Sequence, residues 1–161
     1  MEMVIVLVML AVMAAIAGPY LSNGVRAFNE SAASVHTLSK LRVASERLVR
    51  EIREVRRDAS GNYDITLPLA SGTLEFFNSD GEQVRVGNAA AQLTLAYASI
   101  AAGTPFTLTD ELGSITFSYL KSDGTPYTSI ADLGIIEFEL VLTHAGSDYR
   151  QRSRVALRNQ P

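Results

Sequence analysis

Glu2 is the only charged residue among the first 25, and it begins an apolar run that continues from Met3 to Ala17. A carboxylate within a bilayer costs roughly 2.5–3.5 kcal/mol, and less near the interface. The next charged residue is Arg26, so the chain offers Glu2 no nearby partner. The chemistry that Glu2 could perform is therefore ion pairing with a cation of another molecule.

Residues of the kinds used in catalysis and metal binding are present, but their spacing forms no recognisable set. His36 falls on a predicted helix and His144 at a predicted strand end, without a serine or carboxylate placed for a triad. Asn78-Ser79-Asp80-Gly81 is too short for a calcium loop and indicates a turn. The chain contains no cysteine, which excludes disulfides and thiolate metal sites. We expect no enzymatic activity, no metal and no cofactor.

Basic residues gather on one stretch of the chain, between residues 47 and 57. This arginine row could hold phosphate or anionic lipid headgroups. A solvated helix face, or pairing with acidic residues elsewhere, is the commoner use of such a row. The net charge of −3 argues against nucleic-acid binding.

The apolar N-terminus has three interpretations. A secretory signal peptide normally begins with basic residues, whereas this chain begins Met1-Glu2. A plain membrane anchor fits the uncharged length of residues 3–25, but gives no role to Glu2 or to Gly18-Pro19. A helix that leaves the membrane and enters a helical polymer gives both features a role.

We expect the helix to continue past Pro19, with a kink or loosened turn at Gly18-Pro19 because proline removes a backbone hydrogen bond. Two uses of this site stay open: local melting when the helix leaves the bilayer, and a static kink relieved by neighbouring helices. Asn23-Gly24 is a second weak point.

An amphipathic pattern follows, from Phe28 to Asp58, and predicts that the helix ends at Ser60-Gly61. Its apolar stripe is expected to pack on the rest of the chain, through Leu41, Leu48, Ile52 and Val55.

After Gly61 the apolar period changes from helical to twofold, which predicts about seven short strands. They are expected near residues 63–67, 74–76, 84–86, 92–98, 114–120, 135–143 and 149–157, with loops at 99–113 and 125–133. The fold class predicted is α+β, a long kinked N-terminal helix packed on an antiparallel β-sheet head. The domains predicted are an apolar membrane or polymerisation helix (1–25), an amphipathic helix packed on the head (26–58) and a β-rich globular head (59–161).

The N-terminal pattern resembles that of type IV pilins and type II secretion pseudopilins, which combine a glutamate, an apolar helix and a helix-breaking proline at this spacing. The stretch from Leu41 to Arg53 is similar to minor pilins of the PilW and MSHA-biogenesis MshO kind. Residues 115–124 and 154–159 point the same way less specifically. The helical resemblance covers roughly a third of the chain, on the scale of part of a domain.

The resemblance implies a structural, non-enzymatic minor pilin. It would insert in the bacterial inner membrane with its head in the periplasm, and then assemble with major and minor pilins, priming the pilus or lying at its tip. Glu2 would neutralise the N-terminal amine of a neighbouring subunit. The family also carries a leader and a methylated phenylalanine before the glutamate; here Met1 directly precedes Glu2, so neither is assigned to a numbered residue. Alternatives are a type II secretion minor pseudopilin and, from another class, a membrane-anchored adhesin or ligand-binding domain.

Overall fold

The computed structural model describes residues 2–66, 72–100 and 103–157, with the exception of the Glu2 side chain. The chain divides into two compact units, Met1–His36 and Thr37–Pro161. We call the first the N-terminal unit and the second the head. The boundary between them falls inside a single helix, so the head contains the last part of that helix and all of the strands.

Helix α1 (Glu2–Arg53) is 52 residues long and runs through Pro19 and Gly24 without interruption. It ends before the predicted stop at residues 60–61. The amides of Glu54 and Val55 bond to carbonyls three residues back, and the amide of Arg56 then bonds to the carbonyl of Phe77, 2.9 Å away. The prediction of a helix to Asp58 was therefore wrong, because pairing with the sheet outcompetes the local helical pattern.

The strands form two antiparallel sheets, and the predicted α+β class, with a long N-terminal helix packed on antiparallel strands, is confirmed. The four-stranded sheet consists of β1 (Leu74–Phe77), β2 (Gln83–Ala89), β3 (Gln92–Tyr97) and β4 (Phe106–Thr109) in that order. The three-stranded sheet consists of β5 (Leu112–Lys121), β6 (Leu133–His144) and β7 (Ser147–Ala156). A short 3-10 helix, η2 (Ile130–Asp132), precedes β6.

Two strand predictions need correction. Strand β4 lies inside residues 99–113, which were predicted to be a loop; it has only four residues, two of them exposed at its start, so its pattern is weak. Conversely, Tyr63 and Ile65 form only isolated bridges, to Arg57 and Phe76, and no strand. Leu67, the third residue of that predicted strand, lies outside the described residues.

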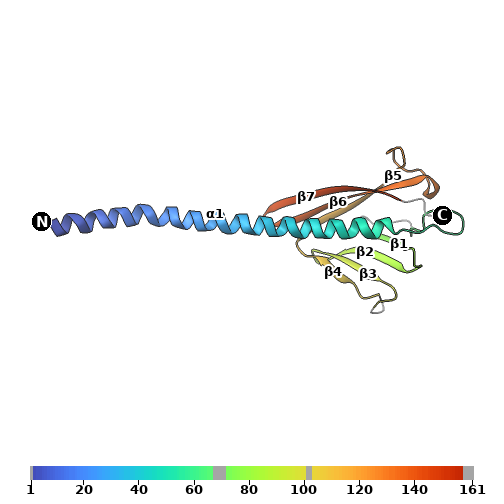
Figure 1. Cartoon of the computed structure of the whole chain (residues 1–161), viewed down its shortest axis with the longest axis horizontal. Coiled ribbons are helices and arrows are strands. Elements are labelled where there is room, and N and C mark those ends of the chain that lie inside the picture. Colours follow the sequence, from blue (N-terminus) through green and yellow to red (C-terminus); the bar gives the residue numbers. More distant parts are fainter. Residues whose placement is uncertain (1, 67–71, 101–102, 158–161) are drawn as a thin grey trace. The chain divides into compact units, whose positions relative to one another are not determined.

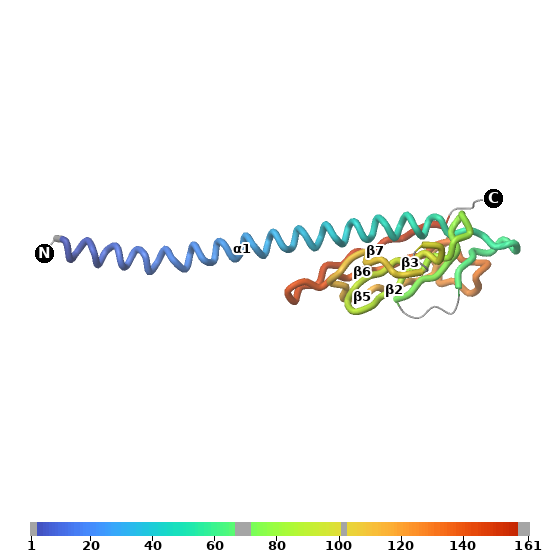
Figure 2. The backbone as a smooth tube through the Cα atoms, turned by 90° about the horizontal axis from the view of Figure 1, so that it is seen from below, coloured from blue at the N-terminus to red at the C-terminus, as the bar shows by residue number. Residues whose placement is uncertain are grey.

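The head is arranged as two sheets with a helix at their opening. In Figure 1 the last part of α1 lies between β5–β7 on one side and β1–β4 on the other. In the view of Figure 2 both sheets lie on the same side of the helix. The helix thus covers the mouth of a V formed by the sheets, and one helical face stays exposed. A single core fills the V, with buried side chains from the helix and from both sheets.

Candidate functional site

The start of α1 is apolar on every side. From Met3 to Ile16 its large side chains are between 52% and 81% exposed, whereas apolar surface in a folded protein is normally covered. Among the described residues, this helix is long and apolar enough to cross a bilayer. The segment can therefore serve as a membrane anchor.

Glu2 is the first residue of α1, and its side chain lies outside the described residues. A negative charge at this end of a helix is favoured by the partial positive charge of the exposed amides. That interaction lowers the cost of keeping the carboxylate ionised, but it does not neutralise the charge in an apolar environment. A cationic partner would neutralise the charge that the helix dipole leaves on Glu2.

Gly18 and Pro19 lie within the helix, seventeen and eighteen positions into it. A β-carbon added at Gly18 would meet no atom within 4 Å, so no contact inside this chain requires glycine there. Pro19 lacks an amide hydrogen and cannot donate the hydrogen bond that an ordinary residue at this position would. Both residues weaken the helix intrinsically.

The four residues predicted to pack helix on head are all buried in the core: Leu41 (3% exposed), Leu48 (0%), Ile52 (0%) and Val55 (5%). The first three lie on α1. Val55 follows the end of the helix and forms a bridge with Asn78 instead. The helix is thus held to the head along about three turns by apolar burial, worth roughly 1.5–3 kcal/mol for each such side chain.

Polar contacts also attach α1 to the four-stranded sheet. Arg47 Nη2 donates to the hydroxyl of Tyr97, which donates to Glu51 Oε1, both at 2.7 Å. Arg47 also pairs with Glu51 at 2.7 Å. The carboxylate is 4% exposed, and burial, with the neighbouring Glu51, raises the pKa of Tyr97. The contact of Tyr97 with this pair was not predicted from the sequence.

A second polar cluster, which we call the collar, lies between the helix and the strands at the end of the head where the helix begins to pack. Lys40 Nζ lies 2.7 Å from Asp110 Oδ1 and 3.6 Å from Glu111 Oε1. Glu111 also bonds to His144 Nδ1 at 2.9 Å and accepts a bond from Thr37 Oγ1 at 3.3 Å. The hydrogen bond with His144, with help from Lys40, lowers the pKa of Glu111. The collar is a structural joint that the sequence did not indicate.

Strained backbone gathers at this collar. Glu111 has a φ of +60°, and the nearby hairpin turns contain Ala90 and Ala91 (+48° and +59°) and Ala145 (+49°). The amide of Leu112 bonds to the carbonyl of Ala91, and that of Thr143 to the carbonyl of Glu111. Non-glycine residues in this region cost about 1–3 kcal/mol each. The surrounding contacts must therefore hold the collar in place.

The arginine row of the sequence is dispersed by the fold. Arg47 is bound to Glu51, Arg56 pairs with Asp64 at 2.7 Å, and Arg57 stacks on Tyr63. Arg56 and Arg57 do not belong to the helix at all.

The two histidines belong to different units: His36 is part of the N-terminal unit and His144 is part of the head. The described residues contain no group of three or more His, Asp or Glu side chains arranged for a metal.

Comparison of the sequence with protein-family models found no match, and comparison with curated proteins found none either. The resemblance to type IV pilins therefore rests on Glu2, the apolar run and Pro19, and it stays a prediction. The established features are the α+β fold, the apolar helix able to anchor the chain in a membrane, and the attachment of its last turns to the head.

Proposed function

We propose that this protein is a minor pilin, a non-enzymatic subunit that inserts in the bacterial inner membrane and assembles through its N-terminal helix into a type IV pilus. In this role it primes assembly or lies at the tip. The observation that carries the proposal is one helix with two kinds of surface. Its first part is apolar and exposed on all sides, whereas its last part is buried along one face by the head.

This division suits a subunit that exchanges one apolar environment for another. The first part of α1 needs a bilayer or a bundle of other helices around it. The head has its own core and two sheets, and stays outside. An anchor alone would also explain the apolar length, and the helix dipole favours an acid at its start, but neither gives that carboxylate a partner that neutralises its charge. Pairing of Glu2 with the N-terminal amine of a neighbouring subunit does, and it would fix the register between helices.

The test is substitution of Glu2 by alanine in the full chain, with incorporation into fibres and insertion into the membrane measured separately. The expected result is normal insertion and loss of incorporation. Glu30→Ala is the matched control, because it removes another carboxylate from the same helix and should leave both measurements unchanged. Unchanged incorporation of Glu2→Ala would show that the docking role is wrong.

The same helix would also suit a minor pseudopilin of a type II secretion system. In that case Glu2→Ala should abolish secretion of the system's substrates rather than pilus assembly. A membrane-anchored adhesin is the third alternative. In that case the full chain would bind a surface ligand in cells that make no fibre, and Glu2→Ala would not alter that binding.

A further inference from the structure

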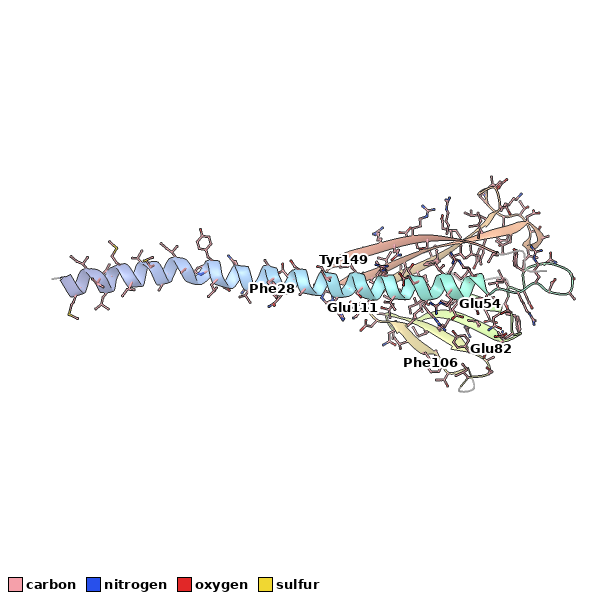
Figure 3. The ribbon with its side chains drawn as sticks, in the orientation of Figure 1. Phe28, Glu54, Glu82, Phe106, Glu111 and Tyr149 are labelled. Atoms are coloured by element: carbon pink, nitrogen blue, oxygen red, sulfur yellow. The ribbon has the colours of Figure 1, made fainter. Side chains whose placement is uncertain are left out.

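An open groove of about 770 Å³ runs along the head between α1 and β7. One side of α1 forms one wall, through Ser45, Val49, Arg50 and Arg53, and β7 forms the other, through Gln151 and Ser153. The hydroxyls of Ser45 and Ser153 meet at 3.2 Å. In Figure 3 the part of α1 that packs on the strands extends from near Glu111 to Glu54, which follows the end of the helix.

The β7 wall of the groove is the edge of a sheet. Among the described residues β7 pairs with β6 alone, and it is ten residues long without a proline. Such an edge presents a row of unpaired backbone amides and carbonyls, and proteins usually shorten or cover it. On the face of β7 that points toward the helix, Gln151 and Ser153 are polar. Their partners in β6, Leu140 and Phe138, are fully buried. The core therefore ends before the edge, and the edge stays accessible.

The groove also contains cations that the head leaves unpaired. Lys40, Arg42 and Arg47 of α1 each have a carboxylate partner. Within the described residues Arg50 and Arg53 have none, and both line the groove. They complement the negative end of the helix dipole. Because no described carboxylate binds them, their guanidinium groups can donate to a ligand.

The opposite face of β7 is basic as well. Three exposed arginines on that face pair with carboxylates of β6. Arg150 faces Glu139, and Arg152 and Arg154 both face Glu137. A strand added beside β7 would thus meet arginines on both of its faces, Arg50 and Arg53 on the inner side and this ladder on the outer side. A second copy of β7 would place like charges opposite one another, which is unfavourable.

We propose that β7 is a docking edge for an extended acidic segment of a partner protein, which adds to the sheet as a further strand and lies in the groove against α1. Its backbone would pair with the free edge, and its glutamates or aspartates would bind Arg50, Arg53 and the outer arginines. Three carboxylates also line the groove. Glu46 is bound to Arg42, whereas Glu54 and Asp80, near the end of α1, favour a basic residue at one end of the segment. This inference concerns the head alone and does not depend on fibre assembly.

The test uses the full chain in detergent micelles and a synthetic peptide of roughly nine residues, the length of an ordinary strand. In this peptide glutamate alternates with valine or threonine after an N-terminal lysine. The expected result is binding that slows amide exchange at alternate residues of β7. Two control peptides separate the contributions: lysine in place of glutamate tests charge, and N-methylation of alternate amides tests backbone pairing. Neither control should bind.

The protein variants are Arg50→Glu and, as a matched control, Arg85→Glu. The second makes the same charge change on an exposed side chain of β2, outside the groove. Arg50→Glu should weaken binding at least about tenfold, and Arg85→Glu should leave it unchanged, with the near-UV circular dichroism of both variants unaltered. The proposal is overturned if the acidic peptide gives no protection of β7 up to ~1 mM, if the N-methylated peptide binds equally well, or if Arg50→Glu binds as tightly as the unmodified chain.

Discussion

Glu111 Oε1 lies 2.9 Å from His144 Nδ1, and this bond joins the crossover between the two sheets to the hairpin of β6 and β7. Glu111 connects β4 to β5, and Lys40 of the helix reaches the same carboxylate. One acidic side chain thereby holds together the helix and both sheets at a place where the backbone is strained. The stability of the head should accordingly be sensitive to protonation at the collar.

Glu111→Gln should therefore reduce the pH dependence of the head's stability. The pKa of Glu111 is lowered in the folded chain from its ordinary value of 4.5, so the unfolded chain binds more protons between the two values. The contribution to the free energy of unfolding is present above the ordinary value and is lost as pH falls through the lowered one. The variant should lose on the order of 1 kcal/mol at neutral pH and show a shallower decline in acid.

The measurement is urea unfolding of the full chain in detergent, followed by near-UV circular dichroism of the tyrosines, from about pH 3 to about pH 7. Glu137 and Asp148 also have lowered pKa values, the first through Arg152 and Arg154 and the second through Thr143 and Arg150. They contribute equally in both proteins, so the difference isolates Glu111. Identical pH profiles would contradict the assignment.

Leu48→Ala should destabilise the head strongly, because Leu48 is fully buried between helix and sheets. Removal of a buried leucine side chain costs about 2–5 kcal/mol. Val43→Ala is the matched control on the same helix: Val43 is 59% exposed, and its truncation should change the free energy of unfolding by less than about 0.5 kcal/mol. Similar losses for the two variants would mean that the helix does not pack as described.

Tyr97→Phe should cost about 1–3 kcal/mol, because it removes one of the donors to the buried carboxylate of Glu51. Tyr127→Phe is a suitable control, since the Tyr127 ring packs against Tyr119 and a phenylalanine retains that contact. Denaturant unfolding of both variants gives the comparison. No loss in Tyr97→Phe would show that Arg47 alone satisfies Glu51.

The fold class and the residues of the helix that are buried followed from short-range patterns in the sequence. Leu41, Leu48 and Ile52 repeat at helical spacing, and the later strands alternate, so local periodicity sufficed. The end of α1 could not be predicted from such patterns. Val55 lies seven residues after Leu48 and so continues the helical pattern, but in the structure it pairs with Asn78, which comes from a distant hairpin.

The polar joints depend on the tertiary fold. Tyr97 meets Glu51 across 46 positions, and His144 meets Glu111 across 33. No local pattern relates such residues, and neither pair has the spacing of a known motif. Glu2 and Pro19 differ in this respect, because both were identified by their positions within one apolar helix.

Pro19→Ala should strengthen α1 at the one interior position where the chain cannot donate a helical hydrogen bond. The helix continues through Pro19, so alanine fits without rearrangement and restores that bond. The intrinsic difference between these residues within a helix is about 3 kcal/mol, against about 1 kcal/mol for Gly18→Ala. Amide exchange of residues 20–24 in the full, membrane-inserted chain should therefore slow by about tenfold to hundredfold for Pro19→Ala and by less for Gly18→Ala.

If local melting of this turn is used when the helix leaves the bilayer, the proline variant should also enter fibres more slowly. If the kink is static, exchange should change while incorporation stays constant. Equal exchange in all three proteins would mean that neighbouring lipid or helices already compensate for the missing hydrogen bond.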